Sequence, residues 1–125
     1  MVIQFPLFVY EPGDATSLHT VESLDAAEGG ELEEFDVQHE NFVFWDAAGI
    51  RVRAATKRES SHWLELTSTE KDDMRGLREA IRAYAAAVGV LPEDVETLSP
   101  ADAVKKLEGA EERRRGPRRW YQFWR

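Results

Sequence analysis

Apolar and polar residues alternate through much of the first half of the chain, at the two-residue spacing of β-strands. Turns rich in Gly, Pro and Ser separate the alternating segments. The pattern predicts strands at residues 2–10, 16–23, 41–46, 50–56 and 62–68. Residues 31–37 mix apolar and acidic positions and could form one more short strand.

The clearest strand pair is 41–46 with 50–56, joined by a short connection that contains Gly49. This connection predicts a β-hairpin in which Gly49 takes a positive φ. In the second strand the apolar residues Ile50, Val52 and Ala54 face one way, while Arg51 and Arg53 face the other. Such alternation indicates a sheet that is buried on one side only.

Helical spacing replaces the alternation after residue 68. Apolar residues recur three or four positions apart, at Met74, Leu77, Ile81, Tyr84 and Val88. The spacing predicts a helix at about 70–88, with Thr69 as its N-cap and Gly89 as its end.

Two further helical segments begin at serine. Ser99 followed by Pro100 predicts a second long helix, at about 100–115, that ends at Gly116-Pro117. Ser23 can cap a single helical turn that stops at Gly29-Gly30.

Strands followed by helices predict the α+β class. We expect an antiparallel sheet of four to six strands over residues ~2–68, with two C-terminal helices, ~70–88 and ~100–115, packed on one face. A length of 125 residues fits one domain. We place that domain at 1–112 and treat 113–125 as a basic, aromatic C-terminal tail.

Charge is strongly segregated along the chain. Residues 1–112 hold all 24 acidic residues and ten of the sixteen Lys and Arg, a net charge of −14, whereas 113–125 carry +6. Eleven carboxylates precede Arg51, the first basic residue. Such a field repels nucleic acid and anionic membranes and accelerates encounters with basic proteins. The alternative is a well-solvated acidic surface without a partner.

Catalytic and metal motifs are weak in this sequence. The chain has no cysteine, and His19, His39 and His62 lack any metal-ligand spacing. Ser61 and His62 are adjacent, so on a strand they point to opposite faces and cannot form a nucleophile–base pair. We therefore expect no catalytic residue, no metal, no cofactor and no small-molecule substrate.

The carboxylates before Arg51 are the candidate partner-binding residues. Two neighbouring carboxylates could act as a general acid and a general base. That chemistry requires burial, which gives the two carboxyl groups different pKa values. A surface for a basic partner accounts better for so many acids in one segment. The candidates are Glu31, Glu33, Glu34, Asp36, Glu40 and Asp46.

The tail RRRGPRRWYQFWR has the ingredients of a nucleic-acid or membrane-interface segment. The acidic body competes for the same arginines, and four large aromatic residues are costly to leave in water. We expect the tail to dock on its own domain or on a second copy of the chain. The second arrangement would make a homodimer. The residues expected to dock are Arg118, Arg119, Trp120, Tyr121, Phe123 and Trp124.

Residues 20–54 contain three stretches that form one pattern: Val21-Glu22-Ser23 through Glu28, Glu34 to Glu40 around Asp36-Val37, and Asp46 with Gly49. By this pattern the segment resembles small, mostly uncharacterised bacterial α+β proteins. Some proteins of this type are immunity partners of secreted bacterial toxins. The resemblance therefore implies a protein-binding role without catalysis.

Together these features predict a cytoplasmic, non-enzymatic protein-binding module, such as an immunity-type inhibitor that presents an acidic surface to a basic toxin. One alternative is a structural or oligomeric protein with a swapped aromatic tail. Another is a small hydrolase that uses His39 or His62 with carboxylates.

Overall fold

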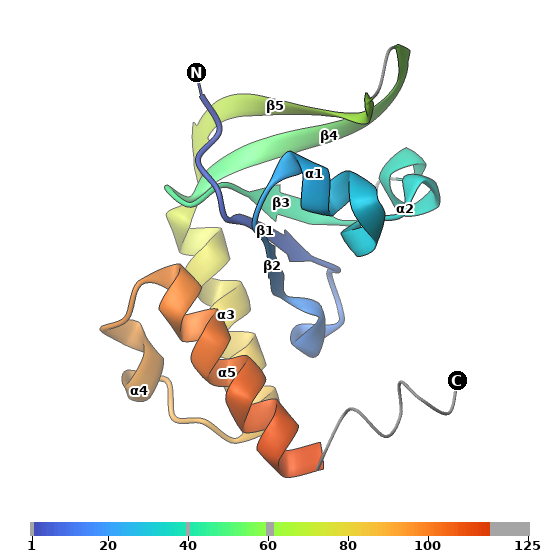
Figure 1. Ribbon diagram of the computed structural model, residues 1–125. Coiled ribbons are helices and arrows are strands. Elements are labelled where there is room, and N and C mark those ends of the chain that lie inside the picture. The colour runs from blue at the N-terminus through green and yellow to red at the C-terminus, as the bar shows by residue number, and fades with distance from the viewer. Residues whose placement is uncertain (1, 40, 60–61, 116–125) are drawn as a thin grey trace.

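Five antiparallel strands form one sheet in the order β2-β1-β3-β4-β5 (Figure 1). The computed structural model describes residues 2–39, 41–59 and 62–115. The strands are β1 (Leu7–Tyr10), β2 (His19–Val21), β3 (Val43–Trp45), β4 (Ile50–Glu59) and β5 (His62–Asp72). The strand number agrees with the prediction of four to six.

Two long helices, α3 (Met74–Val88) and α5 (Pro100–Arg115), lie side by side and pack on one face of the sheet (Figure 1). The short helix α4 (Glu93–Glu96) lies between them in sequence. The predicted α+β class, with two C-terminal helices on one face, is confirmed. No helix in the described part of the chain is long and apolar enough to span a membrane.

A second helical layer covers the opposite face of the sheet, which the sequence did not predict. It consists of α1 (Leu24–Ala26), the π-helical turn η2 (Ala27–Glu31) and α2 (Glu34–Gln38) (Figure 1). The one-turn 3-10 helix η1 (Ala15–Ser17) precedes β2. Ser23 caps α1 as predicted, because its Oγ accepts a hydrogen bond from Ala26 N at 3.0 Å.

Apolar residues on the two faces of the sheet form separate cores. Phe8 and Trp45 pack with α3 and α5, whereas Leu7, Val9 and Phe44 pack beneath α1 and α2. The expectation of a sheet buried on one side only is therefore wrong for the central strands. It holds locally in β4, where Val52 is buried and Arg53 is exposed.

Residues 31–37 do not form a strand. An extended chain would place Phe35 and Val37 on one face, but Val37 is 4% exposed and Phe35 is 62% exposed. The segment instead forms the end of η2 and most of α2, where Glu34 and Asp36 lie in the first helical turn. Carboxylates near a helix N-terminus are stabilised by the helix dipole.

Helix α3 begins later than the apolar spacing suggested. β5 continues to Asp72, and Asp73 occupies the N-cap position of α3. Thr69 is therefore part of the strand, and its Oγ1 donates to the carbonyl of Arg51 on β4 at 2.9 Å. The end at Gly89 is confirmed, with a φ of 76°.

Candidate functional site

Three exposed carboxylates give the start of helix α2 an acidic surface. Glu31 ends η2, Glu33 occupies the N-cap of α2 and Glu34 lies in its first turn. All three side chains are exposed, as the sequence predicted. No Lys or Arg precedes Arg51 in the chain, so no basic side chain from this half of the sequence neutralises them.

An exposed aromatic residue lies within this acidic surface. Phe35 is 62% exposed, and its ring stacks on the imidazole of His39 with 4.1 Å between ring centroids. Nδ1 of His39 lies 2.8 Å from the Phe35 carbonyl, which holds the imidazole against the helix. We name Glu31, Glu33, Glu34, Phe35 and His39 the α2 surface.

Sequence patterning did not single out Phe35, because residues 31–37 mix apolar and acidic positions and were expected only as a possible short strand. Leu32 and Val37, the apolar residues on either side of Phe35, are both buried, so Phe35 is the exposed apolar residue of this segment, and no local pattern of the sequence distinguishes the three. The sequence places His39 near Asp36 and Glu40, a ligand-like grouping that carried no metal prediction. In the structure His39 contacts Phe35 instead.

Asp36 has a structural role at the end of α2. Its Oδ1 accepts a hydrogen bond from Nδ2 of Asn41 at 3.0 Å, and the carbonyl of Asp36 accepts from Asn41 N at 3.2 Å. The side chain is half-buried, so it contributes less to the α2 surface than predicted. Glu40 lies outside the described residues.

The assignment of Asp46 to a partner-binding surface is wrong. Asp46 is 1% exposed, and its carboxylate organises the β3–β4 turn. Oδ1 accepts from the backbone N–H groups of Ala48 at 2.9 Å and Ile50 at 3.0 Å, and Oδ2 accepts from Gln4 N at 3.4 Å. A carboxylate used in this way satisfies buried backbone donors and is not available to a partner.

The predicted tail-docking residues Arg118, Arg119, Trp120, Tyr121, Phe123 and Trp124 all lie outside the described residues, so their docking stays a prediction. The proposed boundary at residue 112 falls inside α5, which continues to Arg115. Arg114 uses its Nη1 to donate to the carbonyl of Ala87 on α3 at 3.0 Å.

Glu28 and His62 form a polar contact between the N-terminal helical layer and β5. Oε1 of Glu28 pairs with Nδ1 of His62, and Oε2 accepts from the backbone N–H groups of Trp63 at 2.8 Å and Leu64 at 3.1 Å. The hydrogen bond from His62 lowers the pKa of the Glu28 carboxyl from its usual 4.5, and the Leu64 and Trp63 N–H groups act in the same direction against the effect of burial.

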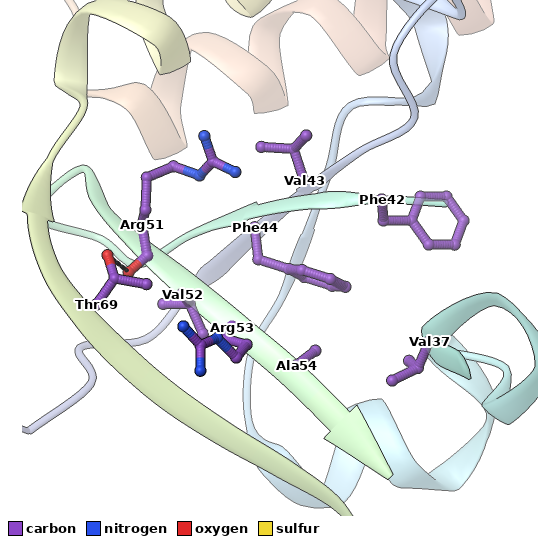
Figure 2. Close-up of a pocket in the computed structure, with 9 residues that line it drawn as sticks. All are labelled: Val37, Phe42, Val43, Phe44, Arg51, Val52, Arg53, Ala54 and Thr69. Atoms are coloured by element: carbon purple, nitrogen blue, oxygen red, sulfur yellow. Dashed lines mark hydrogen bonds between the residues drawn. The ribbon is translucent and has the colours of Figure 1, made fainter. Parts of the chain in front are cut away.

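A hollow of about 360 Å³ opens where β3 and β4 diverge (Figure 2). Between these strands Phe44 pairs with Val52 and Trp45 pairs with Arg51, whereas Val43 pairs with Tyr10 of β1. The lining is mostly apolar, with Arg51, Arg53 and Thr69 as its polar members. None of the lining residues is a His or a carboxylate, so they supply no general acid or base.

Arg51 is held at one side of this hollow. Its Nη1 lies 3.7 Å from Oδ2 of Asp73, its guanidinium lies 5.8 Å from the centre of the Trp45 ring, and Trp45 Nε1 donates to the same Asp73 oxygen at 3.0 Å. Figure 2 shows its guanidinium pointing toward Val43, away from that of Arg53. The two arginines therefore do not converge on one anion.

Comparison with known proteins adds no relative: no family model, no curated protein and no solved structure matches this chain. The resemblance of residues 20–54 to immunity-type proteins stays a prediction.

Proposed function

We propose that this protein is a non-enzymatic binding module that presents the α2 surface to a basic protein partner. An inhibitor or immunity-type protein acting on a basic toxin is the role that we favour. The single observation that carries the proposal is the exposure of Phe35, at 62%, within a group of exposed carboxylates.

Exposed aromatic residues are common anchors of protein interfaces because they bury a large apolar area with few rotatable bonds. Phe35 is also preorganised, since His39 stacks against its ring. A partner that covers Phe35 removes apolar surface from water without ordering a flexible side chain.

Electrostatics supports a basic partner. Glu31, Glu33 and Glu34 are exposed and directly precede the aromatic anchor in the chain, and exposed charges of one sign raise association rates with oppositely charged proteins. Since these charges are exposed and screened by salt, they should affect the association rate more than the dissociation rate.

The test is binding to an identified partner. Immobilised full-length protein is exposed to a lysate of its source cells, a retained basic protein is identified and purified, and its affinity is then measured at low and high salt. We expect affinity to fall at least about tenfold for Phe35→Ala, as for a loss of more than 1.4 kcal/mol. The double variant Glu33→Lys/Glu34→Lys should slow association and abolish the salt dependence.

The matched control is Glu93→Lys/Asp94→Lys, which reverses two exposed carboxylates at α4, in the other helical layer. It changes the net charge of the protein by the same amount as the α2 variant but lies outside the α2 surface. It should therefore preserve most of the affinity for the partner. The proposed surface would be refuted if Phe35→Ala bound the partner as tightly as the wild-type protein. It would also be refuted if the α4 control lost as much affinity as the α2 variant.

A further inference from the structure

Three potential metal-ligating side chains converge at the junction of the N-terminal helical layer and β5. Asp25 lies in α1, Glu28 in η2 and His62 at the start of β5. One carboxylate oxygen from each acid and one ring nitrogen of His62 all lie within 4.8 Å of one another. The convergence is tertiary, since Glu28 and His62 are 34 positions apart.

We propose that Asp25, Glu28 and His62 bind a zinc ion. Zn²⁺ accepts imidazole nitrogen and carboxylate oxygen ligands at about 2.0–2.2 Å, usually four in a tetrahedron. The three side chains supply one nitrogen and two oxygens, and a water molecule can complete the set. Mg²⁺ and Ca²⁺ prefer all-oxygen sites, so the histidine favours zinc.

The backbone of β5 already orients one ligand. Oε2 of Glu28 accepts from Trp63 N and Leu64 N at 2.8 and 3.1 Å, which fixes the carboxylate plane and directs Oε1 toward His62. Hydrogen bonds of this kind position the first ligands in protein metal sites. The Glu28 side chain is only 11% exposed, so it is held in a defined place.

The other two ligands can adjust around this fixed carboxylate. Ligands of one tetrahedral zinc ion lie roughly 3.3 Å apart, given the bond lengths above. Asp25 is exposed, so a rotamer change can bring its carboxylate closer. The His62 side chain is 39% exposed, which leaves a route for the ion and room for a water ligand.

The charge balance also favours a dication. Two carboxylates and a neutral imidazole carry −2 together, which one Zn²⁺ neutralises. Nδ1 of His62 is used by the hydrogen bond with Glu28, so zinc must replace the proton shared between them. Bound zinc would tie the segment that carries the α2 surface to β5.

The test is titration of tag-free, full-length protein with ZnCl₂ by calorimetry, followed by thermal unfolding with zinc or with EDTA. We expect one saturable equivalent and an increase in the unfolding temperature that EDTA reverses. Asp25→Asn is the decisive variant because the side chain is exposed and should not affect folding. It should weaken zinc binding at least about tenfold, and His62→Ala should weaken it by more.

Matched controls use the same chemical changes elsewhere. Asp94→Asn alters an exposed aspartate at α4, and His39→Ala alters an exposed histidine at the end of α2. Both should bind zinc like the wild-type protein. The site is refuted if no saturable binding occurs, if Asp25→Asn binds as tightly as the wild-type protein, or if the controls lose as much affinity as the site variants. These results do not depend on the α2 surface, so they test the zinc site separately from the proposed function.

Discussion

Tyr84 of α3 donates its phenolic hydrogen to Oε2 of Glu111 of α5, at 2.5 Å, inside the interface between the two helices. Tyr84 is 1% exposed and Glu111 is 2% exposed. A buried carboxylate is costly unless donors satisfy it. The hydroxyl therefore supports the last turns of α5 as well as filling the core.

Replacing Tyr84 with Phe should destabilise the protein by about 1.5–3 kcal/mol, the usual range for a hydrogen bond to a charged group. The ring volume is kept, so the loss reports the hydroxyl. Urea unfolding measures the change in the free energy of unfolding. Tyr10→Phe is the control, since no hydrogen bond of the Tyr10 hydroxyl occurs within the described residues, and it should change stability by less than about 0.5 kcal/mol. Equal effects of the two variants would contradict the assignment.

Asp46→Ala should destabilise the β3–β4 hairpin by about 2–3 kcal/mol, because three backbone N–H groups lose the buried carboxylate that accepts from them. Asp46→Asn keeps one oxygen for Ala48 and Ile50, so its cost should be smaller. Chemical denaturation gives both values. If Asp46→Ala left stability unchanged but weakened partner binding, a surface role for this residue would be restored.

Gly49→Ala should destabilise by clearly more than 1 kcal/mol, for two reasons. Gly49 has a φ of 80°, and an added Cβ would lie 2.8 Å from Met74 Cε and 3.0 Å from Met74 Cα. Gly13→Ala is a matched control, since Gly13 has a φ of 92° but nothing within 4 Å of the added atom. It should cost only the backbone strain of about 1 kcal/mol. The difference between the two measured values isolates the contact with α3.

Acid should weaken the attachment of η2 to β5. The pKa of Glu28 is lowered in the folded protein, so the folded state holds the ionised carboxylate more strongly than the unfolded chain does. Its contribution to stability is complete above the usual pKa of 4.5 and is lost as the pH falls through the lower folded value. In Glu28→Gln the free energy of unfolding should therefore depend less on pH below about 4.5 than in the wild-type protein. Unfolding curves at several pH values measure this dependence. The exposed Glu93→Gln should keep the wild-type pH dependence.

Sequence patterning predicted the helices best, because α3 has one apolar stripe and a clear C-terminal end, and α5 has a clear N-terminal start. Ser99, Pro100 and Gly89 mark those ends through local chemistry that needs no tertiary contact. The short segment 31–37 was predicted poorly. A few residues carry too little periodicity to distinguish a helical turn from a strand, and the burial of Leu32 and Val37 decided the outcome.

Some residues of the candidate sites could likewise be identified from the sequence, whereas others required the structure. Glu31, Glu33 and Glu34 could be identified from the sequence, because a run of carboxylates without nearby cations is exposed in almost any fold. Asp46 could not be separated from them by composition. Only the closed β3–β4 turn shows that its carboxylate binds backbone N–H groups.

The sequence by itself determined the fold class, the strand-then-helix order, the hairpin at Gly49 and the charge segregation, since each depends on periodicity, local backbone preference or residue type. The tertiary structure alone decided the second helical layer, the exposure of Phe35 and the meeting of Asp25, Glu28 and His62. These features depend on contacts between residues far apart in the chain. Such contacts form only when both faces of the sheet are covered, and no local pattern records them.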